Sequence, residues 1–307
     1  MDIFLQQIVN GLVQGSIYAL VALGYTMVYG IMGLINFAHG EVVMIGTLVT
    51  ITVAGSLIKA GMPVALAGLA GLSASVLVCM ALGWGLERIA YRPLRNAPRL
   101  TPLITAIGMS IVLQNLAMMI WGRNYLTFPA LLPKINFEVA GAHFTFIQVV
   151  IVLVSAVTMG GLLALIYRTK LGMAMRATAQ NPAVASLMGV NINRVIAAAF
   201  VIGSALGALA GVMVGTYYEI AHYQMGFMLG LKAFTAAVLG GIGNLAGAML
   251  GGLLLGLIEA LGAGYIGDLT GGFLGSHYQD IFAFIVLIVV LMFKPSGLFG
   301  EKTGDRA

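Results

Sequence analysis

Long apolar runs separated by short polar segments dominate the chain. A membrane helix needs about 20 largely apolar residues to cross the hydrocarbon core, so we expect each run to form a helix within a membrane. Eight or nine of them would be transmembrane helices. The run that carries Lys232 is short, which favours a partial or tilted span. The nine runs lie near residues 5–31, 42–58, 64–86, 101–121, 146–167, 195–217, 226–242, 245–263 and 278–293.

Composition indicates the same class. Hydrophobic residues make up 60% of the 307 positions and charged residues only 8%, whereas soluble domains carry about 25% charged residues. The longest polar connections, 122–145 and 168–194, are too short to form a separate soluble domain. We therefore expect an all-α polytopic membrane protein with broken or partial helices, and a single transmembrane domain over residues 1–307.

The distribution of lysine and arginine predicts the orientation. Cytoplasmic loops of membrane proteins are enriched in these residues, and the connections 122–145, 218–225 and 264–277 are poorer in them. Nine crossings with the N-terminus outside and the C-terminus inside satisfy this pattern. The basic residues assigned to the cytoplasm are Arg88, Arg92, Arg95 and Arg99, then Arg168, Lys170, Arg176 and Arg194, then Lys294, Lys302 and Arg306.

One polar group interrupts the apolar pattern early in the chain. The stretch INFAHGEVVMIG contains Asn36, His39 and Glu41. We expect one helix to break before this stretch and another to begin near Gly40, at the cytoplasmic end of the first two spans. Asn36 and Glu41 could merely cap the new helix while His39 lies at the headgroup level. Alternatively the three side chains line a translocation pathway, because broken helices at membrane depth occur where backbone is buried in protein or lines a cavity.

A second interruption lies in LGGIGNLAGAMLGG, residues 239–252, where Asn244 follows a cluster of glycines. The shared pattern N-[FL]-A at Asn36 and Asn244 suggests two related halves, as in many transporters. Glycines at helical spacing predict close packing between helices. These glycines are Gly243, Gly247, Gly251, Gly252 and Gly256, and a second set is Gly207, Gly211 and Gly215.

Charged residues inside spans are costly and are candidates for function. Lys232, Glu259 and Glu219 are the clearest cases. Each also has a purely structural interpretation. Lys232 could extend its amine to the membrane interface, Glu219 could lie at the periplasmic surface, and Glu259 could bond to a neighbouring helix.

The basic segment 168–194 contains more structure than a linker needs. Its sequence predicts a helix over AMRATAQ, a stop at Asn181-Pro182, and a second short amphipathic helix that ends at Gly189. An ordered cytoplasmic helix of this kind could receive the push of an external motor. The alternative is a surface loop that is needed only for topology.

Motifs of several enzyme classes are missing from the sequence. It contains no G-x-x-x-x-G-K-[ST] phosphate loop, no H-E-x-x-H, no paired-cysteine metal pattern and no G-x-S-x-G elbow. We therefore expect no ATPase site, no metal and no catalytic residues in this chain, and a membrane enzyme has little support. A secondary transporter that works alone stays possible, with Glu41 and Glu259 as the acids of an ion-coupling site.

Four stretches carry a resemblance along nearly the whole chain. They are YTMVYGIMGLINFAHGEVVMIG (25–46), ERIAYRPLR (87–95), AIGMSIVLQN (106–115) and KAFTAAVLGGIGNLAGAMLGG (232–252). The chain resembles the LivH-type permease subunits of high-affinity branched-chain amino-acid ABC transporters. Related permeases handle urea or other small amides, so the resemblance alone does not fix the substrate.

The resemblance implies a multi-pass subunit of the bacterial inner membrane that imports leucine, isoleucine and valine by alternating access. Its partners would be a LivM-like second permease, two cytoplasmic ATPases that use ATP, and a periplasmic amino-acid-binding protein. Membrane lipid would surround it, it would bind no cofactor itself, and nucleic acid would play no part. Whether the paired permease is a second copy or a different chain stays open.

Two sets of site residues follow. The translocation pathway is predicted to include Asn36, His39, Glu41, Asn244 and Glu259. The family's segment that docks into the ATPase resembles residues 168–194, which assigns coupling roles to Gly172, Arg176, Ala177, Asn181, Leu187 and Gly189.

Overall fold

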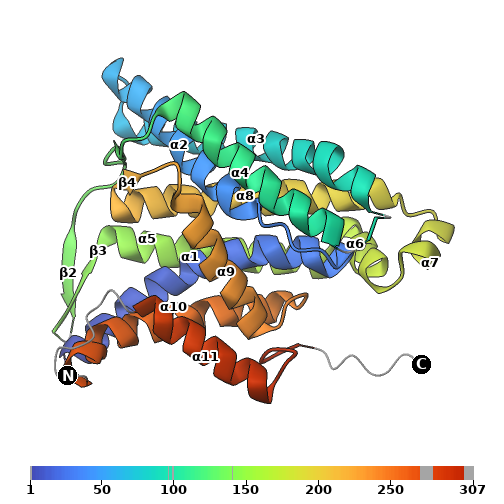
Figure 1. Ribbon diagram of the computed structural model, residues 1–307. Helices are drawn as coiled ribbons and strands as arrows, with labels where there is room; N and C mark the ends of the chain where they lie inside the picture. Colours follow the sequence, from blue (N-terminus) through green and yellow to red (C-terminus); the bar gives the residue numbers. More distant parts are fainter. Residues whose placement is uncertain (1, 96, 99, 140, 270–278, 301–307) are drawn as a thin grey trace.

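The computed structural model describes residues 2–95, 97–98, 100–139, 141–269 and 279–300. This part of the chain folds into a bundle whose longest helices run side by side (Figure 1). The helices are α1 (Asp2–Met32), α2 (His39–Lys59), α3 (Val64–Leu86), α4 (Leu100–Trp121), α5 (Phe146–Arg168), α6 (Lys170–Gln180), α7 (Pro182–Leu187), α8 (Ile192–Tyr218), α9 (Met225–Gly240), α10 (Leu245–Leu269) and α11 (Gln279–Phe293).

Each predicted apolar run contains a helix, which confirms the helical fold class. In the described part of the chain, seven helices are long and apolar enough to cross a membrane. Helices α9 and α11 are apolar but shorter, as expected for the run that carries Lys232. The run 245–263 is longer than predicted, because α10 continues to Leu269.

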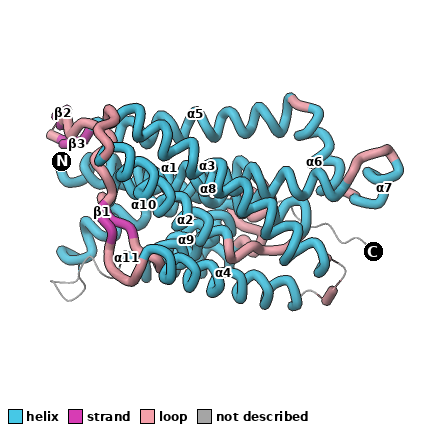
Figure 2. Tube along the Cα trace, turned by 90° about the horizontal axis from the view of Figure 1, so that it is seen from above, coloured by secondary structure: helices cyan, strands magenta, loops and turns pink. Residues whose placement is uncertain are grey.

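Four short strands lie at one end of the bundle, opposite the end that carries α6 and α7 (Figure 2). Strand β1 (Leu126–Thr127) pairs with β4 (Ile220–Ala221), and β2 (Asn136–Val139) pairs with β3 (Ala142–Thr145), both antiparallel. Thr145 then caps α5 through a reciprocal capping box with Gln148. These strands were not predicted from the amino-acid sequence.

The three basic segments meet at the other end. The α3–α4 connection, the α6–α7 segment and the end of α11 all lie there, and the described chain begins at the opposite end (Figure 1). Arg99, Lys302 and Arg306 lie outside the described residues. The clustering agrees with one cytoplasmic face, while the orientation in a membrane stays a prediction.

Helices α1 and α8 form the centre of the bundle, whereas α3, α4 and α5 leave most of their apolar surface exposed, as helices that face lipid or another membrane subunit do. Close approach of backbones holds the centre together. A Cβ at Gly15 of α1 would lie 2.8 Å from the Cα of Leu253, and one at Gly252 would lie 2.5 Å from the Cα of Ala19. The predicted packing role of the α10 glycines is confirmed at this α1–α10 contact.

Candidate functional site

The first helix break begins at the exposed Gly33 and runs into the bundle. Helix α1 ends at Met32, Gly33 adopts a positive φ of 65°, and α2 begins at His39. The side chain of His39 is 2% exposed, and a Cβ at Gly24, two turns before the end of α1, would collide with its ring. The chain therefore turns back into the bundle after Met32, and α2 begins beside Gly24, about two turns before the end of α1.

The break begins where α1 ends, on the face that carries the basic segments (Figure 1), and it continues into the bundle to the start of α2. The orientation of that face in a membrane stays a prediction. The break itself is where the sequence predicted it. Its depth depends on glycines in other helices that leave room for the imidazole, because a Cβ at Gly207 of α8 would also lie 3.4 Å from the His39 ring. A hydropathy pattern along one segment does not reveal such a contact.

Asn36 does not cap α2. The residue that precedes the helix is Ala38, which makes no side-chain capping bond. The side-chain oxygen of Asn36 instead accepts a hydrogen bond of 2.7 Å from the hydroxyl of Tyr91, and Asn36 is 3% exposed. Asn36 thus ties the break to the π-helical turn Glu87–Tyr91 that follows α3.

Ion pairs stabilise the π-helical turn Glu87–Tyr91. Glu87 is fully buried and forms ion pairs with Arg92, at 2.9 Å, and with Arg95. Arg95 also donates to the side chain of Asn193 at the start of α8. Burial lowers the pKa of Arg95, and the Glu87 carboxylate opposes that shift. The cluster fixes the segment that presents Tyr91 to Asn36.

Glu41, in the first turn of α2, is fully buried and contacts α4. Its Oε1 accepts hydrogen bonds from the Ser110 hydroxyl at 2.9 Å and from the Gln114 amide at 2.8 Å. Ser110 lies ten residues into α4, or about 15 Å at 1.5 Å per residue, so the carboxylate is deep in the bundle. The only sequence signal for these partners was a serine and a glutamine on one helix face in an apolar run.

The other oxygen of Glu41 faces α9. Its Oε2 has no hydrogen-bond partner in the described part of the chain, and a Cβ at Gly226 would lie 2.6 Å from it. Gly226 belongs to the first turn of α9, and Glu41 belongs to that of α2. The partial positive charge of both helix starts therefore acts on this carboxylate and opposes the cost of burying its charge.

A second buried polar cluster joins α1, α9 and α10. The hydroxyl of Tyr18 donates to Glu259 Oε2 at 2.7 Å, and the Lys232 amine lies 3.2 Å from the same oxygen. The Lys232 and Glu259 side chains are 15% and 1% exposed. Glu259 thus bonds to neighbouring helices, and Lys232 does not extend to the interface. Glu219 pairs with Lys134 at the exposed end that carries the strands.

The second helix break, Gly241 to Asn244, is a capped turn. Asn244 accepts from the backbone amide of Gly247 at 3.0 Å and donates to the carbonyl of Phe299 at 3.0 Å. Gly241 and Gly243 have φ values of 109° and 97°, which favour glycine. The turn therefore starts α10 and also fixes the chain that follows α11.

The predicted coupling segment has the expected form. Thr169 caps α6, Asn181 caps α7 by accepting from the Val184 amide at 3.1 Å, and Gly189 follows with a φ of 85°. Gly172 lies so close to the carbonyls at the end of α5 that a Cβ would overlap them. The tip of α7 exposes apolar side chains, because Leu187 is 87% exposed.

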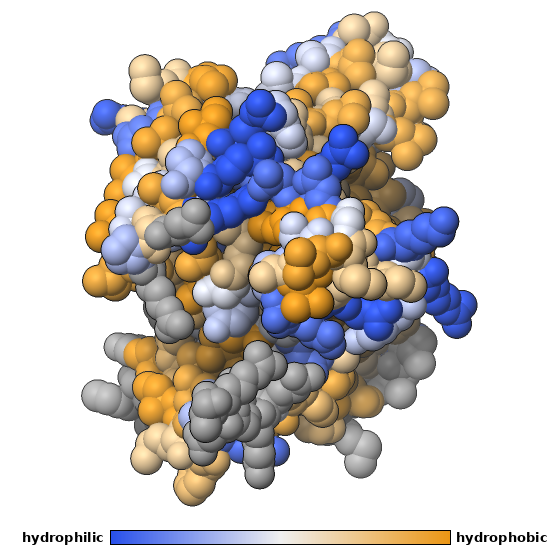
Figure 3. All heavy atoms as spheres, turned by 90° about the vertical axis from the view of Figure 1, so that its right-hand side faces the viewer, coloured by the Kyte–Doolittle hydropathy of each residue, from blue (hydrophilic) through white to orange (hydrophobic). Residues whose placement is uncertain are grey.

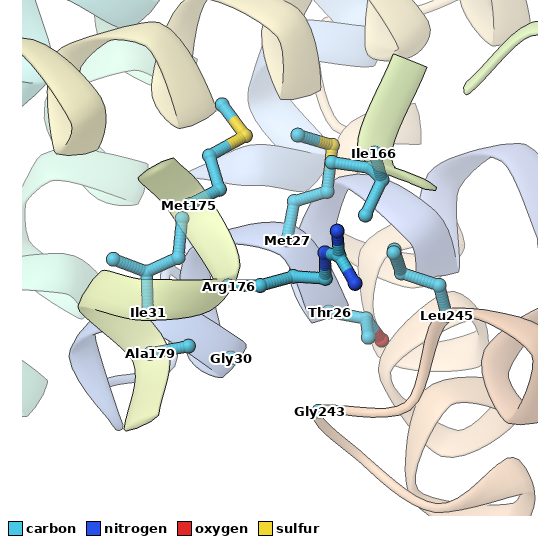
Figure 4. A pocket seen from close by; sticks show the side chains of 10 residues that line it. All are labelled: Thr26, Met27, Gly30, Ile31, Ile166, Met175, Arg176, Ala179, Gly243 and Leu245. Atoms are coloured by element: carbon cyan, nitrogen blue, oxygen red, sulfur yellow. The ribbon is translucent and has the colours of Figure 1, made fainter. Parts of the chain in front are cut away.

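This tip lies on the face that carries the basic segments, where hydrophilic patches alternate with apolar side chains (Figure 3). Arg176 of α6 does not belong to the tip. Its side chain is exposed to solvent and borders a cavity beside α1 (Figure 4). Ala177 is partly buried on the same helix.

Comparison with known proteins identifies the family. Residues 7–291 match the family model described as "Branched-chain amino acid transport system / permease component". The chain belongs to this family. The resemblance predicted from the four sequence stretches is thereby confirmed.

Two relatives in this branched-chain permease family match almost the full length of the chain. It is 49% identical to the high-affinity branched-chain amino acid transport system permease protein BraD of Pseudomonas aeruginosa, over 99% of this chain and 98% of BraD. It is 46% identical to the corresponding LivH protein of Escherichia coli K12, over 99% and 97%. A solved structure, PsaBC from Streptococcus pneumoniae in complex with Fab, aligns at 16% identity and a TM-score of 0.46, over 96% and 94%.

Proposed function

We propose that the chain is the transmembrane permease subunit of an ATP-driven importer for leucine, isoleucine and valine in the bacterial inner membrane. The observation that carries this proposal is the sequence identity of 49% to BraD and 46% to LivH over 99% of the chain. The names of both relatives state high-affinity branched-chain amino acid transport. The multi-pass helical fold is consistent with it. The chain itself acts without an ATPase site and without a cofactor.

The α6–α7 segment is the proposed contact with two cytoplasmic ATPases, which would bind the ATP. Exposed apolar side chains at a rigid tip mark a protein interaction site, and Val184, Leu187 and Met188 are 53%, 87% and 81% exposed. Leu187 would enter a groove of the ATPase. Gly172, Asn181 and Gly189 would shape the segment, and Arg176 and Ala177 would connect α6 to the bundle.

The remaining partners would be a LivM-like second permease and a periplasmic amino-acid-binding protein. Helices α3, α4 and α5 offer exposed apolar faces to lipid or to the second permease. The binding protein would deliver the amino acid to the end of the bundle that carries the strands. Selection among amino acids would then rest mainly on that receptor.

Alternating access would use the buried break. Helix α6 packs against both α5 and α1, so a push on α7 would reach the end of α1 just before the break. Asn36, His39 and Glu41 would lie beside the translocation pathway. Asn244, at the second helix break, and Glu259, which pairs with Lys232, would also lie near this pathway. Small displacements of α1 would change how α2 meets α4 and α9.

Reconstitution tests the function. Proteoliposomes would contain the chain, its candidate permease partner and the ATPases, with ATP enclosed and the receptor outside. We expect uptake of labelled leucine that needs every component and that valine reduces in competition. Competition by urea without competition by valine would instead assign a small amide as substrate. Uptake by the isolated chain under a proton or sodium gradient would overturn the proposal.

A pair of variants tests the α7 contact. Leu187→Asp places a charge on the apolar tip and should lower ATP-dependent uptake at least tenfold, because the carboxylate would be desolvated in the groove. Leu187→Met keeps an apolar side chain of similar volume and should retain most of the uptake. Equal uptake by the two variants would remove Leu187 from the coupling contact.

A further inference from the structure

The outward face of α3 carries a continuous row of exposed side chains. Leu66, Leu69 and Leu77 are 56%, 62% and 66% exposed, and the row ends at Trp84, which is 47% exposed. Helical spacing places these residues on one face. The hydroxyl of Ser73 in the same row donates to the carbonyl of Leu69 at 2.8 Å, so it needs no water. A helix surface of this kind is suited to contact hydrocarbon.

The length of this apolar surface matches a membrane. From Val64, the first residue of α3, to Trp84 the helix rises about 30 Å at 1.5 Å per residue, which is the thickness of the hydrocarbon core. Tryptophan concentrates at the boundary between hydrocarbon and headgroups. Arg88 follows one turn later, about 6 Å beyond this boundary, and would therefore lie at the depth of the lipid phosphates.

Arg88 packs on Trp84 and has no acidic partner in the described part of the chain. Its guanidinium carbon lies 5.2 Å from the centre of the Trp84 ring, within the range of a cation–π interaction. The side chain is exposed, and the ion pairs of the neighbouring Glu87 are made with Arg92 and Arg95. An arginine placed in this way keeps its N–H donors available for a phosphate, which it can bind by two parallel hydrogen bonds.

The same order of residues recurs at the end of α5. Val157 and Tyr167 are 75% and 58% exposed, and the guanidinium carbon of Arg176 lies 5.3 Å from the centre of the Tyr167 ring. Both aromatic–arginine pairs lie at the end of the bundle that carries the basic segments (Figure 1). Two outward-facing helices thus change from apolar to aromatic to basic at the same end, which indicates a membrane boundary there.

We propose that Trp84 and Arg88 bind the headgroup of an anionic phospholipid such as phosphatidylglycerol. Arg88 would bind the phosphate, and the acyl chains would run along the row that contains Leu77. A zwitterionic lipid also carries a phosphate, but its own cation opposes the arginine. A second membrane subunit on this face would bury an arginine that no described acid pairs, which is costly.

The site adjoins the turn that presents Tyr91 to Asn36. Arg88 is the second residue of the π-helical turn Glu87–Tyr91. A bound phosphate would hold this turn from the membrane side, while the ion pairs of Glu87 hold it from the protein side. An anionic lipid would thereby stabilise the first helix break, whatever solute the chain transports.

Tryptophan fluorescence tests the site, because the chain has only two tryptophans, Trp84 and Trp121. The full-length Trp121→Phe chain is placed in vesicles of equal parts phosphatidylglycerol and phosphatidylcholine. Bromine, the quencher, is attached near the headgroup end of the acyl chains of one lipid or of the other. We expect brominated phosphatidylglycerol to quench Trp84 more strongly, with a relative affinity about fivefold higher, as for one arginine near the headgroups.

Variants of Arg88 in the Trp121→Phe chain show whether this arginine causes the preference. Arg88→Gln should bring the two quenching values together, and Arg88→Lys should keep part of the difference, because lysine retains the charge without the second hydrogen bond. Arg168→Gln, the matched control, removes an exposed charge from the same end of the bundle and should keep the full preference. Equal quenching by both lipids in the Trp121→Phe chain, or an equal preference in Arg88→Gln and Arg168→Gln, would overturn the site.

Photocrosslinking identifies what covers this face in the complete permease–ATPase complex. Ile89, beside Arg88, is 77% exposed, and Ile89→p-benzoylphenylalanine would place a photoreactive ketone there. We expect phospholipid adducts that are enriched in phosphatidylglycerol relative to the membrane. Adducts without this enrichment, or an adduct with a protein subunit, would contradict the lipid site. Failure of the assembly to import leucine would overturn the proposed function and leave the lipid site standing.

Discussion

The two helix breaks share the sequence pattern N-[FL]-A and differ in what their asparagines do. Asn244 caps α10, is partly exposed and also holds the carbonyl of Phe299. Asn36 caps nothing, is buried, and accepts from Tyr91. The asparagine of the α9–α10 break thus combines a local cap with one partly exposed bond to the segment after α11, while the asparagine of the α1–α2 break is buried and makes only its distant bond.

This difference shows how limited a local motif is as a guide to mechanism. A cap forms from residues within four positions of one another, so its energy depends on local chain geometry. A buried junction depends on partners that the fold supplies, and removal of one partner leaves another polar group unsatisfied. Substitutions at the first break should therefore be the more costly, which four tests examine in order of expected size.

The largest effect is expected from Gly40→Ala. A Cβ at Gly40 would overlap the carbonyl of Gly226 and lie 2.9 Å from the Cα of Gly230, so α2 and α9 would have to separate. We expect a loss of about 3 kcal/mol in the free energy of unfolding, measured by SDS titration in mixed micelles. Gly55→Ala, on the same helix where a Cβ meets open space, is the control. Similar losses in both variants would contradict the close packing at this junction.

Next in size is Glu41→Ala, which removes the acceptor for Ser110 and Gln114. The loss of stability should be about 2 kcal/mol, because the buried Ser110 hydroxyl loses its acceptor and the Gln114 amide keeps only its longer bond to Ser110. Glu41→Gln keeps an acceptor oxygen and should lose clearly less. The same titration compares the two variants. A larger loss for Glu41→Gln would mean that the negative charge, held by the two helix starts, matters more than the hydrogen bonds.

The Asn36–Tyr91 bond can be isolated by a double-mutant cycle. Asn36→Ala and Tyr91→Phe should each cost about 1.5 kcal/mol. The double variant should cost clearly less than the sum, because the two groups are each other's partners. Strict additivity would show that the 2.7 Å contact contributes nothing to stability.

The smallest effect is expected at the second break. Asn244→Ala should cost about 1 kcal/mol, the usual loss for an N-cap. Asn244→Asp should recover only part of this loss, because a carboxylate oxygen can still accept from Gly247 but cannot donate to the carbonyl of Phe299. Thermal unfolding of the purified chain in detergent compares these variants with Asn36→Ala. If Asn244→Ala proved the more damaging substitution, the distinction between the two breaks would be lost.

The sequence by itself determined the class, the helices and the positions of both breaks. Apolar runs of the right length predicted the membrane helices, and Pro182, Gly189 and Asn181 predicted the α6–α7 pair because they act on the backbone next to them. Gly33 ended α1 for the same local reason. These properties depend on neighbours in the chain, which a sequence shows directly.

Only the tertiary structure decided the depth of the first break and the partners of its polar groups. Tyr91 lies 55 positions from Asn36, and Ser110 and Gln114 lie 69 and 73 positions from Glu41. In an apolar bundle many helix pairings bury similar areas, so the few close glycine contacts select the arrangement and thereby which polar side chains meet.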